Sequence, residues 1–213
     1  MLDKKEINKV IDLLLELYPD AKAELNFTNP FELLIATILS AQCTDVRVNK
    51  TTDSLFKDLK TPEDYLKLTE EELGKRIYSC GFYKTKSKNI LETCRILIEK
   101  HNGKVPEAIE ELMELPGVGR KTANVVVSNA FGTPAIAVDT HVFRVSNRIG
   151  LSNSKNVLDT EKDLMKNIDK NMWTKAHHLL IFHGRRVCKA RNPLCEECPI
   201  RPYCFYYKNR REK

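Results

Sequence analysis

A proline and two glycines interrupt helical patterning in the stretch Leu115–Ala123, which reads L-P-G-V-G-R-K-T-A. Proline has no amide hydrogen, and glycine loses more conformational freedom than other residues on folding, so neither continues a helix well. Apolar residues recur at helical spacing on both sides, over 106–114 and 121–131. The sequence therefore predicts two helices joined by a tight hairpin turn.

The turn has the chemistry to hold an anion such as phosphate. Gly117 and Gly119 present bare backbone, and the unpaired amides that begin the second helix favour a negative charge. Arg120 and Lys121 follow at once. The residues alone leave two interpretations open: a DNA-binding hairpin, or a simple helix connection followed by solvated charges.

Helical patterning extends through most of the chain. Asp3 with Glu6 forms a capping box, Asn29-Pro30 is typical of a helix start, and Phe31–Leu39 is apolar nearly all round. No run alternates with the period of two that strands require, so we expect an all-α fold. The expected helices cover 3–18, 30–39, short segments after Thr61 and Thr69, 84–101, 106–114, 121–131, 140–150, 159–168 and 172–187.

The net charge of +6 is concentrated at one end of the chain. The 213 residues include 35 Lys or Arg and 29 Asp or Glu, and the segment 184–213 alone holds nine Lys or Arg against three Glu. Those thirty residues therefore account for the whole excess. A basic end indicates a polyanionic partner such as nucleic acid, although basic tails also simply aid solubility.

The chain has the features of a soluble cytoplasmic protein. No apolar run approaches the roughly 18 residues that span a bilayer, and residues 1–20 lack a signal-peptide core. The seven cysteines are an odd number, which argues against a full disulfide framework. We therefore expect no membrane partner and a reducing compartment.

Four of the cysteines lie within seventeen residues near the end of the chain. Cys188, Cys195, Cys198 and Cys204 follow the spacing C-x6-C-x2-C-x5-C, whereas the preceding 187 residues contain only three cysteines. In a reducing compartment, clustered thiols are typical metal ligands. Zinc ribbons usually bring two close cysteine pairs and this segment has one, so structural zinc stays open but fits the spacing less well.

Together these motifs resemble the endonuclease III class of DNA glycosylases. The hairpin stretch followed by V-D-T-H-V-F-R-V at 138–145 is similar to the helix-hairpin-helix and catalytic segment of that class, and the cysteine spacing is similar to its [4Fe–4S] loop. L-S-A-Q-C-T-D at 39–45 and G-F-Y at 81–83 also match. The resemblance runs from Asn29 to Cys204.

The resemblance implies two helical domains that flank a DNA-binding cleft. Residues 22–132 would form a helical barrel domain containing the helix-hairpin-helix, and residues 1–21 with 133–213 would form the iron–sulfur cluster domain. The implied cofactor is a [4Fe–4S] cluster on the four clustered cysteines. A loaded cluster carries about −2, which reduces the +6 of the basic end to roughly +4.

The implied activity is that of a bifunctional DNA glycosylase and AP lyase in base excision repair. Lys121 would attack C1′ of the damaged nucleoside, expel the base and form a Schiff base, and β-elimination would then cut the strand. Asp139 would stabilise the positive charge on the sugar or relay the lysine proton. Taken alone, Asp139 before Thr-His is an ordinary helix N-cap, and one residue can do both.

Several further residues are expected to contact double-stranded DNA that carries a damaged base or abasic site. Gln42 would fill the gap left by the extruded nucleotide, and Phe82 would wedge into the duplex, although a core phenylalanine accounts for Phe82 equally well. His141 and Arg144 would orient Asp139 or bind phosphate, with solvated or core roles as the alternative. The remaining expected contacts are Leu115, Gly117, Gly119, Arg120, Arg185, Arg186, Lys189 and Arg191.

The expected lesions are oxidised pyrimidines such as thymine glycol. Adenine glycosylases of the same superfamily carry a catalytic glutamate where this chain has Thr37, and they lack the hairpin lysine and have a longer C-terminal domain. Two alternatives stay open: a glycosylase of this fold for another lesion, and a non-catalytic DNA-binding protein with a structural metal. We expect a monomer associated with the nucleoid.

Overall fold

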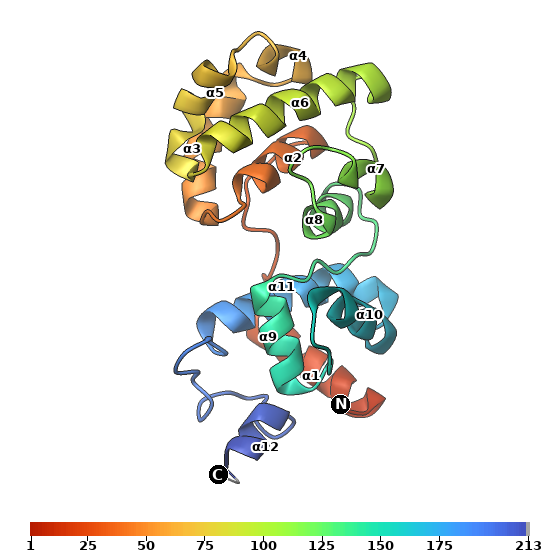
Figure 1. Ribbon diagram of the computed structural model, residues 1–213. Coiled ribbons are helices and arrows are strands. Elements are labelled where there is room, and N and C mark those ends of the chain that lie inside the picture. Colours follow the sequence, from red (N-terminus) through yellow and green to blue (C-terminus); the bar gives the residue numbers. More distant parts are fainter. Residues whose placement is uncertain (212–213) are drawn as a thin grey trace. The chain divides into compact units, whose positions relative to one another are not determined.

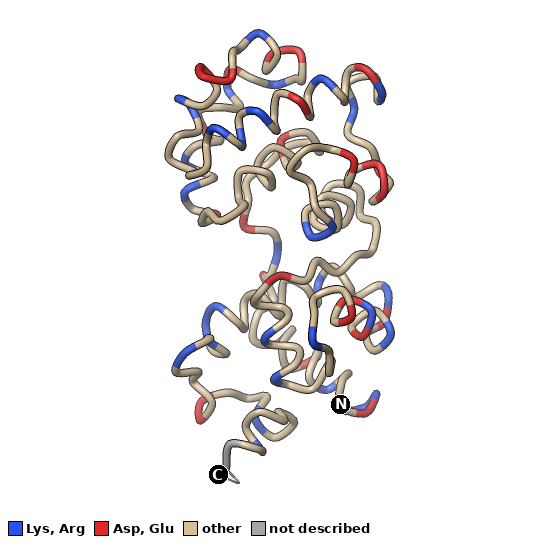
Figure 2. The backbone as a smooth tube through the Cα atoms, in the orientation of Figure 1, with Lys and Arg blue, Asp and Glu red and all other residues tan. Residues whose placement is uncertain are grey.

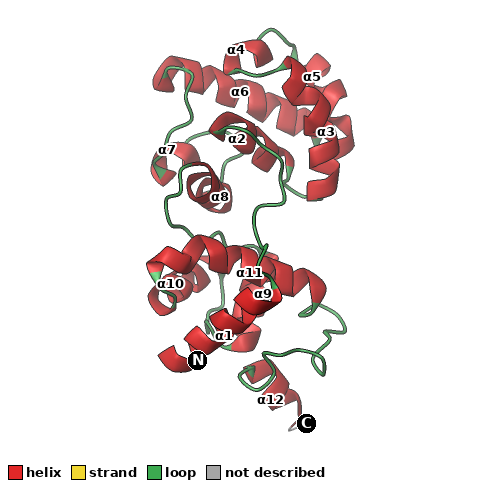
Figure 3. Ribbon diagram, turned by 180° about the vertical axis from the view of Figure 1, so that it is seen from behind, coloured by secondary structure: helices red, strands yellow, loops and turns green. Residues whose placement is uncertain are grey.

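The computed structural model describes residues 1–211, and these residues form helices and no strand (Figure 3). The prediction of an all-α fold is confirmed. The chain divides into a central unit, Ala23–Thr133, and a terminal unit that joins Met1–Lys22 to the chain from Pro134 onward. The boundaries expected from the sequence were 22–132 for one domain and 1–21 with 133–213 for the other.

The helices of each unit follow the chain order (Figure 1). The central unit contains α2 (Pro30–Leu39), α3 (Asp45–Asp58), α4 (Pro62–Tyr65), α5 (Glu70–Ile77), the 3-10 helix η1 (Tyr78–Cys80), α6 (Tyr83–His101), α7 (Ile109–Met113) and α8 (Arg120–Ala130). The terminal unit contains α1 (Lys4–Leu17), α9 (Thr140–Ile149), α10 (Val157–Asn167), the 3-10 helix η2 (Lys170–Met172), α11 (Trp173–Arg186) and α12 (Phe205–Arg211).

Most expected helices form within two residues of their expected ends. There are three departures, two of which have a clear physical reason. The helix expected over 106–114 shrinks to α7, because Ala108 is extended and provides no side-chain cap. Helix α3 was not expected, since threonines make up half of its buried face and weaken the apolar periodicity. Helix α12 follows the last cysteine and was not expected either.

The central unit is built around α2, which is buried from Phe31 to Leu39. Helices α3, α6 and α8 pack against it, and α4 and α5 lie along α6 (Figure 1). The start of α2 is closed by two polar contacts: Asn29 Oδ1 accepts from the Glu32 amide at 2.9 Å, and Glu32 Oε2 accepts from the Thr28 amide at 2.6 Å. These bonds satisfy donors at the buried helix start and fix where α2 begins.

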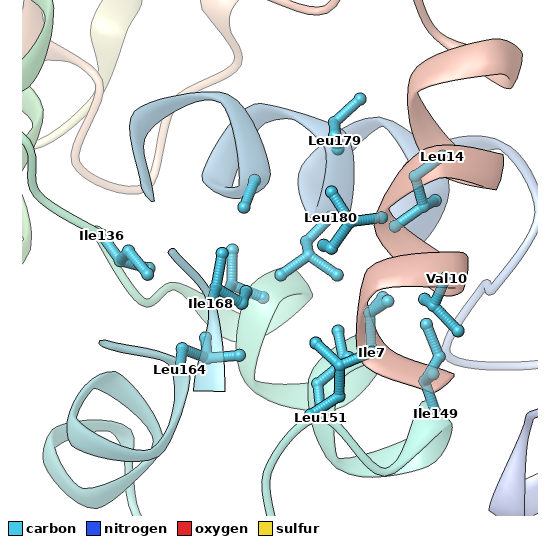
Figure 4. Close-up of a cluster of buried hydrophobic side chains, with 14 of the residues drawn as sticks. Ile7, Val10, Leu14, Ile136, Ile149, Leu151, Leu164, Ile168, Leu179 and Leu180 are labelled. Carbon is cyan, nitrogen blue, oxygen red and sulfur yellow. The ribbon is translucent and has the colours of Figure 1, made fainter. Parts of the chain in front are cut away.

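The terminal unit has a core to which both ends of the chain contribute (Figure 4). Ile7, Val10 and Leu14 of α1 lie against residues of α9, α10 and α11. The capping box at Asp3 forms as predicted: its Oδ1 accepts from the Glu6 amide at 2.9 Å, and Glu6 Oε2 accepts from the Asp3 amide at 3.0 Å. Helix α1 is therefore a core element of this unit and not an appendage.

Replacing Leu14 with alanine should lower the free energy of unfolding of the terminal unit by about 2–5 kcal/mol, because Leu14 is fully buried and the deletion leaves a cavity. Leu17→Ala is the matched control on the same helix, since Leu17 is 37% exposed, and it should change stability by less than about 1 kcal/mol. Urea unfolding followed by the fluorescence of Trp173, the single tryptophan, reports on this unit. Equal effects of the two variants would contradict the packing described here.

Candidate active site and cluster loop

The hairpin between α7 and α8 is held in place by α6. Thr93 Oγ1 of α6 donates to the Pro116 carbonyl at 3.2 Å. Gly117 has a positive φ of 79°, and a Cβ at this position would lie 2.9 Å from Nδ2 of Asn89. Only glycine combines this backbone conformation with this close approach. The tight turn predicted from the sequence is confirmed, and its position is set by packing against α6.

The second glycine of the hairpin has a different surrounding. A Cβ at Gly119 would meet nothing within 4 Å, and φ is −91°, so nothing inside the protein requires glycine there. Gly119 is the N-cap of α8 and offers no side-chain acceptor, so the first amides of α8 are left without a side-chain cap. Bare backbone and uncapped amides at an exposed helix start suit a bound anion.

Lys121 is the second residue of α8 and is exposed. Arg120 before it is exposed as well. Leu115, which was expected to contact DNA, is 2% exposed, so its side chain belongs to the core and only its backbone is left for a partner. The hairpin therefore displays one lysine and one arginine on a turn whose apolar residues face inward.

Asp139 is the N-cap of α9 in the terminal unit. Its Oδ1 accepts from the amides of His141 and Val142, each at 2.8 Å, so the cap anticipated from the sequence is present. Both bonds involve one oxygen. Within the described residues Oδ2 makes no hydrogen bond, and the half-buried carboxylate keeps one oxygen for another partner.

Arg144 ties α9 to the end of α11 and to the cluster loop. Its guanidinium donates to the carbonyls of Gly184 at 3.0 Å and Cys188 at 3.2 Å. The same group lies 3.2 Å from His141 Nδ1, and since arginine only donates, Nδ1 is the acceptor and the proton of neutral His141 lies on Nε2. Arg144 is thus half-buried, and its guanidinium binds backbone carbonyls within the terminal unit.

Gln42 and Phe82 are the two residues expected to enter DNA, and both lie in the central unit. Gln42 is exposed with φ 53°, just after α2. Phe82 is 64% exposed with φ 48°, just before α6. The alternative of a core phenylalanine is therefore wrong. Left-handed backbone is uncommon for residues other than glycine, and for a bulky side chain it marks a strained and usually functional position.

The four clustered cysteines line one cavity. Cys188, Cys195, Cys198 and Cys204 face it together with apolar residues such as Ile149 and Ile200, and none is in a disulfide. No three His, Cys, Asp or Glu side chains of the described chain converge closely enough to hold a single metal ion. Four thiols spread around a cavity suit a group larger than one zinc ion, and an iron–sulfur cluster is held by four thiolates in this way.

Burial shapes the chemistry of these thiols. It raises the pKa of Cys198 to about 11 and also raises the pKa of Cys204. Both groups therefore stay protonated near neutral pH until a metal replaces the protons. His183 is buried beside them, with Nε2 3.6 Å from Cys198 Sγ and Nδ1 3.1 Å from Tyr18 Oη, and desolvation lowers its pKa to about 4.

Arg148 was missed by the sequence analysis. It lies one helical turn beyond Arg144 on α9 and donates to the carbonyls of Lys189 at 2.7 Å and Ala190 at 3.1 Å. Its guanidinium also lies over the ring of Tyr206, 4.5 Å from the centroid. The four-residue spacing from Arg144 was the available signal, because it places both arginines on the helix face that meets the cluster loop.

Basic residues recur along the end of α11 and the loop that follows it (Figure 2). Their contacts differ. Lys189 and Arg191 are exposed on the loop after α11. Arg186 is exposed but stacks on Phe182, with its guanidinium 4.5 Å from the ring centroid. Arg185, at the end of the same helix, is exposed. These four residues form a positive surface along the end of α11 and the cluster loop.

Comparison with known proteins supports this assembly of features. A family model described as the HhH-GPD superfamily of base excision DNA repair proteins matches residues 35–170, and the iron–sulfur binding domain of endonuclease III matches residues 188–204. Endonuclease III of Bacillus subtilis (strain 168) is 51% identical over 214 residues, which cover 100% of this chain and 98% of that protein. The chain belongs to the endonuclease III family.

Solved structures of related proteins have the same fold. A trapped endonuclease III–DNA covalent intermediate matches with a TM-score of 0.94 at 53% identity, covering 99% of this chain and 100% of that one. A thermostable thymine-DNA glycosylase matches with a TM-score of 0.87 at 26% identity, covering 96% and 98%. The protein is thus a base excision repair protein with an iron–sulfur binding domain, and the expected [4Fe–4S] cofactor is confirmed.

The purified protein should have an absorption band at about 400 nm, as thiolate-bound iron–sulfur clusters do. Cys204→Ala should abolish this band, because the cluster loses one of its four ligands. Cys94→Ala is the matched control: Cys94 is a free thiol buried in α6 of the central unit and is not one of the four clustered cysteines, so its removal should leave the band unchanged. Iron and sulfide analysis of both variants checks the assignment. A colourless parent protein that contains zinc would overturn it.

Proposed function

We propose that the protein is a bifunctional DNA glycosylase and AP lyase that removes oxidised pyrimidines from double-stranded DNA and cuts the strand by β-elimination. The observation that carries the proposal is Lys121, an exposed lysine at the start of α8, directly after a hairpin whose second glycine has no internal reason to be glycine. A DNA-binding module needs such a turn, but it does not need a lysine nucleophile beside it.

Lys121 supplies the chemistry of both steps. Its neutral amine attacks C1′, the bond from C1′ to the base breaks, and the base leaves with the electron pair and takes up a proton. Opening of the sugar ring then gives an imine between Lys121 and C1′. Loss of a proton from C2′ eliminates the 3′ phosphate and cuts the strand. The sugar carbon is reached only after the nucleotide has left the stack.

Asp139 supplies the opposite charge. Its Oδ1 is fixed by two backbone amides, and Oδ2 is left to face the positive charge that develops on the sugar. Such a carboxylate is pre-organised, because its orientation is set by α9 and does not change during the reaction. The cap and the catalytic role thus use different oxygens of one side chain.

DNA binding is assigned to two further sets of residues. Gln42 and Phe82 enter the duplex when the damaged nucleotide is extruded, and the backbone at Gly117 and Gly119 with Arg120 holds a phosphate. The second set follows the cluster loop. Arg185, Arg186, Lys189 and Arg191 face phosphates there. Arg144 joins α9 to the loop through the Gly184 and Cys188 carbonyls and contacts His141. Leu115 is left with its backbone as a DNA contact, because its side chain is buried.

The cluster loop is assigned as a DNA-facing scaffold. Cys188, Cys195, Cys198 and Cys204 would hold the [4Fe–4S] cluster, which supplies a rigid anchor for the basic loop and takes no part in base removal. Arg148 supports the loop from α9 through the Lys189 and Ala190 carbonyls. Apolar residues such as Ile149 and Ile200 line the same cavity.

Thr37 supports the lesion class. At the place where adenine glycosylases would carry a glutamate, Thr37 is 2% exposed and donates to the Leu33 carbonyl at 2.7 Å. Thr37 therefore has no carboxylate that could take the role of that glutamate, and its hydroxyl is bonded within the helix. Because a thymine-DNA glycosylase shares the fold, a mismatched thymine is the second candidate substrate, and a panel of lesion-bearing duplexes separates the two.

We place the protein in the cytoplasm as a monomer at the nucleoid, where its DNA substrate lies. The relatives found by sequence similarity are bacterial, and the positive surface suits the phosphate backbone. No helix among the described residues combines the length and apolar character of a membrane span.

Lys121→Gln should abolish borohydride trapping of a covalent adduct on thymine-glycol DNA, because glutamine forms no imine. Salt-sensitive DNA binding should fall less than about tenfold, since most phosphate contacts lie elsewhere. Lys104→Gln is the matched control for the loss of one exposed charge in the central unit, and it should trap like the parent. Trapping by Lys121→Gln would show that another amine is the nucleophile.

Asp139→Asn should separate the cap from the catalytic role. Asparagine caps helices as well as aspartate does, so the free energy of unfolding should stay within about 0.5 kcal/mol of the parent. The rate of base release should fall about 100-fold or more, because the charge opposite the sugar is lost. Single-turnover assays and urea unfolding measure the two effects. Full activity in Asp139→Asn would reduce Asp139 to a cap.

A further inference from the structure

A lysine with no assigned role is buried in the central unit. Lys86 of α6 is 5% exposed, and its ammonium donates to the carbonyls of Leu39 at 2.8 Å and Cys80 at 2.9 Å. Neither acceptor is a carboxylate. A buried charge is unfavourable unless fixed polar groups replace the lost water, so two backbone carbonyls held this close point to a specific arrangement.

The Leu39 carbonyl is available because α2 ends there. In a continuing helix the amide of Cys43 would bond to it, but that amide bonds to the Ser40 carbonyl instead, at 3.1 Å. Lys86 therefore satisfies a carbonyl at the negative end of α2. The Cys80 carbonyl is the corresponding group at the end of η1.

Each of these carbonyls is followed within three positions by a residue proposed to enter DNA. Gln42 comes three positions after Leu39, and Phe82 comes two positions after Cys80. Both are exposed and both have left-handed backbone, at φ 53° and 48°. Such conformations persist only where the surrounding structure holds them. The Lys86 ammonium thus binds the backbone just before each of the two segments, the Gln42 loop and the Phe82 turn.

Further contacts join the same two loops and the helix between them. The Lys86 amide donates to the Phe82 carbonyl at 3.0 Å, and Cys80 Sγ lies 3.4 Å from Thr51 Oγ1 of α3. Burial lowers the pKa of the Lys86 ammonium. Among these contacts, Lys86 is the charged group that bonds both to the segment before Gln42 and to the segment before Phe82.

We propose that Lys86 is a positioning residue, whose ammonium fixes the Gln42 loop and the Phe82 turn relative to each other so that both side chains enter the duplex as one unit. This inference rests on the proposed roles of Gln42 and Phe82. Without the ammonium, two carbonyls lose their donor and the loops separate or relax out of the left-handed conformation. Base extrusion then suffers, but the chemistry at Lys121 does not.

Lys86→Met keeps the length of the side chain and removes the charge and the donors. We expect its single-turnover rate of base release from a thymine-glycol duplex to fall at least tenfold. Borohydride trapping on a single-stranded abasic oligonucleotide should stay within twofold of the parent, because that substrate needs no extrusion. Lys88→Met, at an exposed position of the same helix, is the matched control and should change neither measurement.

A double-mutant cycle tests the coupling directly. Gln42→Ala should slow base release in the parent, but should slow it less than twofold further in Lys86→Met, because the loop is already displaced. Independent effects that multiply would overturn the positioning role, as would a Lys86→Met variant with the parent's duplex rate or an equal loss on both substrates. If Lys86→Met does not fold at the assay temperature, Lys86→Gln is judged by the same criteria. No effect of Gln42→Ala in the parent would instead refute the proposed role of Gln42.

Discussion

The structure depends on how an all-helical chain deals with the unpaired backbone groups at its helix ends. Donors are left at each helix start and acceptors at each helix end, and the chain must satisfy them or expose them to a partner. Asp139 satisfies two donors of α9, and Lys86 satisfies an acceptor of α2. The start of α8, after Gly119, has no side-chain cap. The residues assigned to DNA lie at these ends because that is where backbone and side chains meet a ligand together.

Much of the fold was predictable because its signals are local. The capping box at Asp3, the N-cap at Asn29 and the glycine turn at Gly117 depend on residues only a few positions apart, and all three formed as expected. Helix α3 was missed because part of its buried face consists of threonines, whose hydroxyls bond within the helix, so its pattern is not apolar. Local sequence signals therefore predict where a helix ends better than they predict which of its faces is buried.

The residues of the candidate site likewise fall into two groups, those with a local sequence signal and those that depend on distant contacts. The cysteines, Lys121 and Asp139 were singled out from motifs. Arg144, Arg148 and Lys86, by contrast, each bind a carbonyl that lies 40 or more residues away in the chain. Sequence spacing can place Arg144 and Arg148 on one helix face, but it does not identify the distant carbonyl that each arginine binds. The sequence also could not decide whether Phe82 lies in the core or on the surface, because an apolar residue has the same sequence signal in both places. Its exposure of 64% places it on the surface.

The placement of α1 has a consequence for synthesis of the protein. Its apolar face, with Ile7, Val10 and Leu14, packs against helices that include α11, which ends at Arg186. At the usual pace of about 5–20 residues per second, the ribosome makes α11 roughly ten to thirty seconds after α1. During that interval the central unit is fully synthesised and can fold. The apolar face of α1 stays uncovered until α11 has been made. The nascent chain therefore exposes at its first helix an apolar surface that the finished protein buries.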